Sequence, residues 1–321
     1  MRKTSTIVTA AFAGAVLAGC SLGDAPPSDV SAGSLAEAGD LSGVEVTVGG
    51  KEFTEQLILC EVTAQALESA GAKVERSCGM SGSSTVRSAL TSGDVDLYWE
   101  YTGTGWITHL GETKAIADPT ELYQTVAEAD EKQNSIVWLE PSPANNTYAV
   151  AASKEQADKL GVSTLSDYAK LAKSDAGAAD FCGAAEFFGR DDGWPGLQDA
   201  YGFKLPKGNV SELAAGAIYN SIDKAKPCAF GEVFATDGRI AALDLVVLED
   251  DKKFFTAYNP SVTIRKEALD TNPAIADVLA PVAEALTDET LQALNAEVDV
   301  DGATPEKTAK EWLTKEGFVG D

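Results

Sequence analysis

Between Val44 and Trp106, short runs of apolar and β-branched residues alternate with longer segments of mixed polarity. The short runs predict strands. The longer segments predict helices, because they begin at a Thr or Ser and are followed by a Gly. This strand–helix order indicates a parallel sheet, which binds ligands in the loops at the carboxyl ends of its strands. The predicted elements are the strands Val44–Val48 (ended by Gly49-Gly50), Lys73–Ser77 and Val95–Tyr98, and the helices Thr54–Ala70 (N-cap Thr54, stopped by Gly71) and Ser83–Ser92 (stopped by Gly93).

The alternation continues to the carboxyl terminus. The turn-like Asn145-Asn146 and the segment FFTAYNP, which ends at Pro260, are predicted as two crossings between two α/β lobes. Two lobes joined by two crossings form a hinged clam with the ligand between them. The predicted strands are Ser135–Leu139, Thr147–Ala152, Ala179–Cys182, Cys228–Phe234, Leu245–Leu248 and Ser261–Ile264. The predicted helices are Pro119–Lys132, two short pieces within 153–173, Leu197–Tyr201, Val210–Lys224, Asp237–Leu243, Ala274–Leu286, Asp288–Glu297 and Pro305–Lys315, with Glu186–Asp192 and the following GWPGL as a loop.

The amino terminus has the pattern of a bacterial lipoprotein signal. Arg2 and Lys3 precede an apolar stretch that is short for a membrane span, and Leu17-Ala18-Gly19-Cys20 matches a cleavage site whose cysteine takes a lipid. An ordinary signal peptide with a nearby cysteine is the alternative. The roughly 280 residues after residue 43 suffice for two lobes. We expect a signal peptide over 1–19, a flexible, lipid-anchored tether over 20–43, lobe 1 over 44–147 and 259–321, and lobe 2 over 148–258.

Composition and charge favour a solvated body. The 321 residues have a formal net charge of −25, spread along the chain rather than gathered in one run. Nucleic acid is excluded as a partner, because phosphates are bound by Lys/Arg patches. The chain has no H-E-x-x-H or phosphate-loop motif, its single histidine, His109, is expected on the surface, and Glu52, Glu55 and Glu100 have no acid–base spacing. We therefore expect no catalytic residues and no cofactor.

Five cysteines are present, and Cys20 is assigned to lipid. An exported body favours disulfides among the other four. Our hypothesis pairs Cys60 with Cys78 inside lobe 1 and Cys182 with Cys228 inside lobe 2; four buried free thiols are the alternative. Because no two cysteines have C-x-x-C spacing, no metal site is predicted.

Two motifs carry a resemblance to a known family. Together, GGKEFTEQLILCE and SGDVDLYWEYTGT resemble the substrate-binding proteins of ABC importers for glycine betaine, choline, carnitine, proline betaine and related quaternary amines. The similarity continues through NNTYAV, RDDGWPGL, FATDGRI and FFTAYNP. It implies a two-lobed α/β fold of the periplasmic-binding-protein type II. It also implies a protein on the extracytoplasmic face of the bacterial cell membrane, expected to be a monomer, that delivers an osmoprotectant to permease subunits driven by a separate ATPase.

The resemblance implies an aromatic cage for the quaternary ammonium group. Such a group has no N–H to donate, but the negative face of each aromatic ring attracts it by roughly 0.5–2 kcal/mol. The matching motif positions are Tyr101, Tyr148, Phe234 and Tyr258. Tyrosine is the usual residue at each, and Phe234 keeps the ring face without the hydroxyl. Asn146 matches a flanking position whose backbone carbonyl can add to the negative lining.

For a ligand carboxylate, the resemblance implies Lys51 and Thr104 from lobe 1 and Arg190 from lobe 2. A carboxylate bound from both lobes favours closure, because those bonds form only in the closed state. The family usually has GSK where this chain has Gly49-Gly50-Lys51. Trp106 and Trp194 lie near the predicted cleft and are expected to pack in the core or at the rim.

Alternatives remain open at this point. A single aromatic ring is more often core packing than part of a cage. Lys51 could be a surface lysine, Arg190 could pair with Asp191 or Asp192, and Thr104 could cap a turn. A sensor without transport would have the same site. A same-fold binding protein for another small polar solute, such as an amino acid, would need a carboxylate facing the amine in place of the rings.

Overall fold

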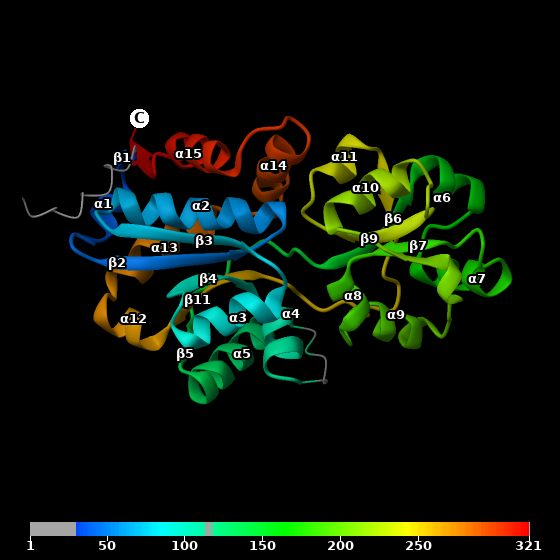
Figure 1. The fold of residues 1–321 in the computed structure, drawn as a ribbon, viewed down its shortest axis with the longest axis horizontal. Coiled ribbons are helices and arrows are strands. Elements are labelled where there is room, and N and C mark those ends of the chain that lie inside the picture. The colour runs from blue at the N-terminus through cyan, green and yellow to red at the C-terminus, as the bar shows by residue number, and fades with distance from the viewer. Residues whose placement is uncertain (1–29, 113–115, 117, 321) are drawn as a thin grey trace, which may run out of the picture.

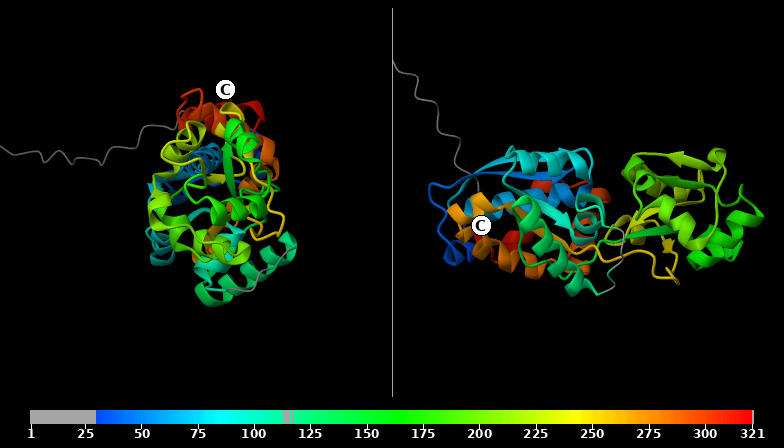
Figure 2. Two further views of the ribbon diagram at one scale, coloured as in Figure 1. Left: turned by 90° about the vertical axis from the view of Figure 1, so that its right-hand side faces the viewer. Right: turned by 90° about the horizontal axis from the view of Figure 1, so that it is seen from below.

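The computed structural model describes residues 30–112, 116 and 118–320. Two α/β bodies lie side by side and are joined by extended segments (Figure 1). The view from below shows the same two bodies with the joining segments between them (Figure 2). Lobe 1 here means the body built on the sheet that contains β2 (Glu45–Lys51), and lobe 2 the body built on the sheet that contains β6 (Tyr148–Ser153).

Lobe 1 is built on a five-stranded sheet in the order β3-β2-β4-β11-β5. β2 pairs in parallel with β3 and β4, whereas the late strand β11 pairs antiparallel with β4 and β5. The predicted parallel sheet is therefore confirmed for the first three strands and becomes mixed at β11. The bounds are β3 Lys73–Met80, β4 Leu97–Tyr101, β5 Ile136–Trp138 and β11 Pro260–Arg265.

Helices cover both faces of this sheet (Figure 1). α2 packs between the sheet on one side and α14 and α15 on the other, so most of its circumference is buried. α3 and α5 cover the opposite face with aliphatic side chains. Trp312 and Leu313 of α15 are buried in the α2 core, as predicted. The bounds are α2 Thr54–Ser69, α3 Ser83–Ser92, α4 Thr102–Thr104, the π-helical turn η1 Gly105–His109, α5 Pro119–Asn134, α12 Lys266–Thr271, α13 Ala274–Ala285, α14 Asp288–Asp299 and α15 Pro305–Lys315.

Lobe 2 has a second five-stranded sheet, in the order β10-β6-β9-β7-β8. β6 pairs antiparallel with β9 and β10, and β7 pairs in parallel with β8 and β9. The strands are β7 Phe181–Gly183, β8 Val210–Glu212, β9 Phe230–Phe234 and β10 Leu245–Val247. The helices are α6 Lys154–Leu160, α7 Leu165–Ser174, α8 Ala185–Gly189, α9 Trp194–Tyr201, the 3-10 turn η2 Lys207–Asn209, α10 Ala215–Asp223 and α11 Arg239–Ala242.

Two segments connect the sheets, one from β5 to β6 and one from β10 to β11. They run side by side: the Asn146 N–H donates to the Tyr258 carbonyl at 3.1 Å, and the Tyr258 N–H donates to Asn145 Oδ1 at 2.7 Å. The predicted crossings at Asn145-Asn146 and FFTAYNP lie in these two segments. The residue limits of the lobes, which also assign the helices and termini, remain a prediction.

The sequence predicted that the glycine pair after Val48 ends its strand, and this prediction was wrong. β2 continues through Gly49-Gly50 to Lys51. A Cβ on Gly50 would lie 3.1 Å from the Gln56 carbonyl and 3.1 Å from the Cys60 Cβ. The glycine therefore permits the close approach of α2 to β2 instead of breaking the strand.

Other local predictions were wrong where long-range pairing decides the structure. The predicted loop over Glu186–Asp192 and GWPGL contains α8 and the start of α9. The predicted helix Val210–Lys224 begins only at Ala215, because Val210 pairs with Phe181 in the sheet. Thr54 is the first helical residue rather than the N-cap, and its hydroxyl donates to Asp299 at 2.7 Å.

The segment predicted as a tether is partly folded. Residues 1–29, with the predicted signal peptide and Cys20, lie outside the described residues. β1 (Ser31–Ala32) pairs with β12 (Val319–Gly320), and α1 (Leu35–Ala38) follows. Leu35 and Leu41 are each 1% exposed and belong to the core of lobe 1. Residues 31–41 therefore differ from the predicted tether, and the two fully buried leucines among them are too few to give a periodic pattern.

Both disulfide pairings are confirmed. Cys60 of α2 is bonded to Cys78 of β3, with 6.1 Å between their Cα atoms. Cys182 of β7 is bonded to Cys228, just before β9, with a Cα separation of 5.7 Å. Each bond therefore lies within one lobe, and neither links the two lobes.

Candidate ligand-binding site

A cavity of about 630 Å³ lies between the lobes, within the ~300–1,000 Å³ typical of small-molecule sites. Its lobe 1 wall comes from the loops after β2, β3 and β4, at the carboxyl ends of those strands. Its lobe 2 wall comes mainly from α8 and its flanks, from β6 and β9, and from residues 212–215 between β8 and α10. The structure brings together every residue predicted to bind ligand, although their binding role remains a prediction. They are Lys51, Tyr101, Thr104, Asn146, Tyr148, Arg190, Phe234 and Tyr258.

Five aromatic rings form a continuous arc along the cavity. Tyr258 packs edge-on against Tyr148 with 5.7 Å between ring centroids, and Tyr148 lies 5.4 Å from Phe234. Phe53 follows, 5.2 Å from Phe234 and 6.2 Å from Tyr101. Because both lobes contribute rings, the arc is continuous only when the lobes are close together.

Phe53 is a lining residue that the resemblance does not point to. It lies at the junction of β2 and α2, two residues after Lys51, and its side chain is half-buried. Its position in the loop at the carboxyl end of a strand was a usable signal, because ligands bind in such loops.

Hydrogen bonds fix two of the rings. The Tyr101 hydroxyl donates to Glu55 Oε1 at 2.8 Å, and the Tyr258 hydroxyl donates to Asp192. Burial, reinforced by these carboxylates, raises the pKa of both phenols, so both rings are neutral. A Cβ on Gly103 would lie 2.7 Å from the Tyr258 ring, so the glycine lets that ring pack on the backbone of lobe 1. By contrast, the Tyr148 hydroxyl has no hydrogen-bond partner among the described residues and stays available to a ligand.

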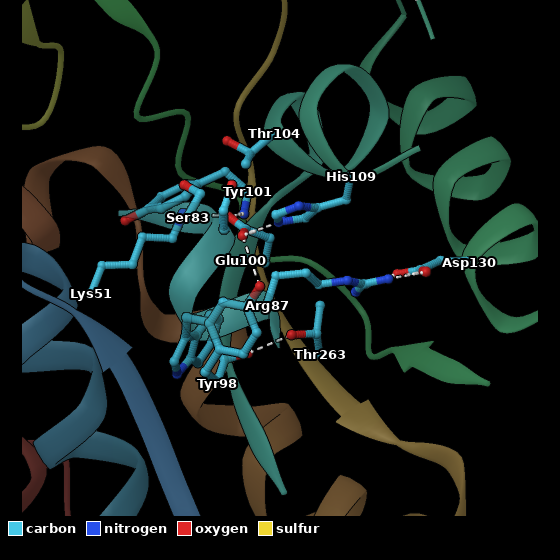
Figure 3. A network of polar contacts seen from close by, with 12 residues as sticks. Lys51, Ser83, Arg87, Tyr98, Glu100, Tyr101, Thr104, His109, Asp130 and Thr263 are labelled. Atoms are coloured by element: carbon cyan, nitrogen blue, oxygen red, sulfur yellow. Dashed lines mark hydrogen bonds and ion pairs between the residues drawn. The ribbon is translucent and has the colours of Figure 1, made fainter. Parts of the chain in front are cut away.

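The ammonium of Lys51 is already paired. Its Nζ donates to Glu100 Oε1 at 2.6 Å, while Glu100 Oε2 lies 2.8 Å from the Tyr98 hydroxyl and 2.7 Å from His109 Nε2 (Figure 3). Burial acts to raise the pKa of Glu100, but the Lys51 charge and the His109 contact hold it below its usual range. The side chain of His109 is 3% exposed, which corrects the expected surface position. The π-helical turn η1 directs it back onto Glu100.

Arg190 reaches across the cleft. Its Nη1 and Nη2 lie 3.4 and 3.3 Å from the Thr104 hydroxyl of lobe 1. Its Nε donates to Asp192 at 2.8 Å, and Nη1 donates to Glu186 at 2.9 Å. Pairing with Asp192, one of the alternatives to ligand binding, therefore occurs together with the predicted cleft position.

Glu186 makes a second contact between the lobes. Its Oε1 accepts from the Ser83 hydroxyl at 2.7 Å, and its Oε2 accepts from the Ser83 N–H at 3.2 Å. Ser83 is the first residue of α3, so the carboxylate lies at the positive end of the helix dipole. The contact links the loop after β3 to α8.

Glu55 joins the lobes at the base of the cleft. It accepts hydrogen bonds from Tyr101, Asn146, Thr236 and Asn295, of which Thr236 belongs to lobe 2. Burial raises the pKa of Glu55 even though these four bonds act to lower it. The side chain of Asn146 thus takes part in the junction between the lobes while the residue lines the cavity.

Glu232 also lines the cavity, although the resemblance does not point to it. It precedes Phe234 by two residues on β9, so both side chains leave the same face of the strand. It is 2% exposed, and its Oε2 accepts from the Ala184 N–H at 2.7 Å. Burial raises the pKa of Glu232 to about 8. The period of two along the predicted strand Cys228–Phe234 was the signal that could have identified it.

The described part of the chain contains no group of three or more His, Cys, Asp and Glu side chains suited to a metal ion. None of the helices described is both long and apolar enough to cross a membrane.

Comparison with known proteins identifies the family. Residues 44–315 match the profile described as the substrate binding domain of an ABC-type glycine betaine transport system. The glycine-betaine-binding protein of Pseudomonas aeruginosa is 37% identical over 281 residues, which cover 85% of this chain and 88% of that protein. The ergothioneine transport permease/ergothioneine binding protein EgtU of Helicobacter pylori is 35% identical over 274 residues, which cover 85% of this chain and 48% of that protein.

The fold agrees with this identification. A solved structure of a glycine betaine/carnitine/choline ABC transporter protein superposes with a TM-score of 0.69 at 28% identity, and the match covers 85% of this chain and 98% of that chain. The predicted two-lobed, type II periplasmic-binding-protein fold is thereby confirmed. Proteins of this family are extracytoplasmic, work with ABC permeases and are not enzymes. The chain belongs to the family of substrate-binding domains of ABC-type glycine betaine transport systems.

Proposed function

We propose that this chain captures a quaternary-ammonium osmoprotectant in the aromatic arc and delivers the closed complex to an ABC permease. The observation that carries the proposal is the arc of five rings that crosses both lobes inside one cavity. Each ring face contributes roughly 0.5–2 kcal/mol to a cation that has no N–H to donate. The compounds in the relatives' names, glycine betaine, carnitine, choline and ergothioneine, all carry such a cation.

A ligand carboxylate, where one is present, binds between Arg190, Thr104 and Lys51. Both cations already have buried carboxylate partners, which hold their side chains in place and reduce the net charge that they offer. The Arg190–Thr104 contacts are long, at 3.3–3.4 Å, so a carboxylate that bridges these groups shortens the link between the lobes. Closure around the ligand follows from bonds made only in the shut state.

The remaining parts of the proposal rest on the sequence. Residues 1–19 are a signal peptide, and Cys20 carries lipid that anchors the monomeric protein to the cell membrane. Acyl chains contribute about 0.8 kcal/mol per buried CH₂, so stable anchoring needs more than one chain. Mass spectrometry of the amino-terminal peptide would show the acylated cysteine, whereas an unmodified Cys20 would contradict the anchor.

Calorimetric titration of the folded body tests the proposed ligand. Glycine betaine, choline, carnitine, proline betaine and ergothioneine form the panel, with glycine and proline as unmethylated controls. We expect at least one methylated amine to bind and glycine to give no heat. If no quaternary amine gives a heat of binding, the proposal is contradicted. Binding of glycine or proline would instead favour the amino-acid alternative, for which Glu232 supplies a carboxyl group in the cavity.

A further inference from the structure

One buried carboxyl group in the cavity has no assigned use. Glu232 lines the cavity and is 2% exposed. Its Oε2 accepts from the Ala184 N–H at 2.7 Å, while its Oε1 has no hydrogen-bond partner among the described residues. Arg190 is bound to Asp192 and Glu186 instead, and no cation in the described part of the chain pairs with Glu232. Because Glu232 lines the cavity and the protein supplies a donor only to Oε2, a ligand that donates to Oε1 adds a hydrogen bond that the described residues do not make.

Glu232 is placed where a ligand in the arc can reach it. On β9 and β6, Phe234 pairs with Tyr148 and Glu232 pairs with Val150, so the carboxyl group lies one step along the same face from two rings of the arc. Two residues of a strand span about 7 Å. A small molecule whose cation touches the rings therefore brings its polar end to Glu232.

Quaternary amines fall into two classes, those that carry an O–H or N–H donor for Glu232 and those that carry none. Glycine betaine and proline betaine contain no O–H or N–H at all. Choline and carnitine carry a hydroxyl, and ergothioneine carries a ring N–H. A donor-free betaine displaces water from Glu232 without replacing its hydrogen bonds, whereas a donor-bearing ligand makes a hydrogen bond to a Glu232 oxygen. Once Glu232 is ionised, this bond is to a charged group and is stronger than one between neutral groups.

We propose that Glu232 determines specificity by selecting quaternary amines that carry an O–H or N–H donor over donor-free betaines. The inference rests on the proposed function, because the aromatic arc must place the ammonium group. The charged or titratable groups that act on Glu232 or lie beside it in the cavity wall are Glu186, Arg190 and Tyr148. Glu186 and Arg190 are paired with each other, so they leave the carboxyl group without a balancing cation.

Matched ligands test the proposal on the unaltered protein. Choline is compared with its methyl ether, and carnitine with O-acetylcarnitine, because each pair differs by the lost O–H donor. We expect each donor-bearing ligand to bind about tenfold more tightly than its partner. Choline affinity should also rise with pH up to about 8 and then level off, because the donor binds the ionised carboxylate.

The variant Glu232→Gln supplies an independent readout. The Ala184 N–H needs an acceptor, so the amide oxygen turns toward it and the NH₂ group faces the cavity as a donor. The choline-to-ether ratio should fall to about one, while glycine betaine keeps or gains affinity. Glu212→Gln is the matched control, since Glu212 also lines the cavity but is exposed, and it should preserve the ratio.

Three outcomes would overturn the inference. Equal binding of the paired ligands, unchanged in Glu232→Gln, refutes donor selection and leaves the proposed function standing. Glycine betaine affinity that exceeds choline affinity and falls above pH 8 shows a protonated Glu232 that donates to the ligand carboxylate. Absence of binding by every quaternary amine defeats the inference together with the proposed function.

Discussion

The two walls of the cleft hold buried carboxylates in opposite ways. In lobe 1, Glu100 accepts hydrogen bonds from Lys51, the Tyr98 hydroxyl and the Tyr101 N–H and also contacts His109, so both of its oxygens are paired (Figure 3). In lobe 2, Glu232 has one backbone donor and a free oxygen in the cavity. A saturated network orients the groups around it, whereas an unsaturated one can respond to a ligand. Burial alone therefore does not distinguish a structural carboxylate from one that selects ligands.

The largest expected effect is on stability, and it comes from disrupting the hydrogen-bond network of Glu100 in lobe 1. Glu100→Gln removes the anion from Lys51 and leaves a buried ammonium without its partner, which should lower the free energy of unfolding by about 3–5 kcal/mol. Urea denaturation monitored by circular dichroism measures the change. The control is Glu45→Gln, which breaks an exposed pair with Lys73 and should change stability by less than about 1 kcal/mol. Equal changes in the two variants would show that the buried network does not stabilise lobe 1.

Glu232→Gln, in the lobe 2 wall, should raise the free energy of unfolding, whereas Glu100→Gln should lower it. Burial raises the pKa of Glu232 from the usual 4.5 of a glutamate to about 8, so between these pH values the folded state holds a proton that the unfolded state releases. The free energy of unfolding therefore falls as pH rises through this window. Glu232→Gln removes the loss and should stabilise the protein by on the order of 2–4 kcal/mol at pH 8.5. Below pH 4.5 it should have little effect.

Melting temperatures of Glu232→Gln and the unaltered protein, taken in parallel from pH 4 to pH 9, isolate this one group because every other titrating residue is common to both. Stabilisation that does not change with pH would contradict the raised pKa. Destabilisation at every pH would show that Glu232 belongs to a saturated network after all.

The sequence predicts the scaffold of both walls because local signals set it. The helix Ser83–Ser92 ends where predicted, since Gly93 takes the left-handed conformation that stops it. Strand ends and motif positions likewise bring the predicted ligand residues to one cavity. Local patterns fail where a partner strand decides, as at Val210, which pairs with Phe181 instead of starting a helix.

The state of the side chains is much less predictable. Lys51 and Glu100 are 49 residues apart, and only the pairing of β2 beside β4 makes them neighbours. His109 reaches the same carboxylate because of a π-helical turn that no sequence pattern predicted. A charged residue's availability to a ligand therefore depends on tertiary partners, which is why Lys51 could be placed in the cleft but not recognised as already paired.

Removing one ring of the arc should change ligand affinity by less than Glu100→Gln changes the free energy of unfolding. It should change affinity by more than the loss of a single contact between the lobes. Tyr148→Ala should weaken binding of the best quaternary amine by about 1–3 kcal/mol, through the lost cation–π attraction and packing. Tyr148→Phe keeps the ring face and loses only the unpartnered hydroxyl, so it should retain most of the affinity. Calorimetry measures both. If Tyr148→Phe weakens binding as much as Tyr148→Ala, the hydroxyl and not the ring face holds the ligand.

The smallest expected effect concerns the contact that brings the two walls together. Ser83 donates its hydroxyl and its N–H to Glu186 across the cleft. Ser83→Ala removes the hydroxyl bond and should reduce ligand affinity by about 0.5–1.5 kcal/mol, mainly through faster dissociation from a less stable closed state. Ser84→Ala is the matched control, because that neighbouring serine is exposed. Stopped-flow release of a bound quaternary amine separates the two variants. Equal release rates would mean that the Ser83–Glu186 contact forms without stabilising the closed state. The amino terminus of α3 would then not contribute to holding lobe 2 against the ligand.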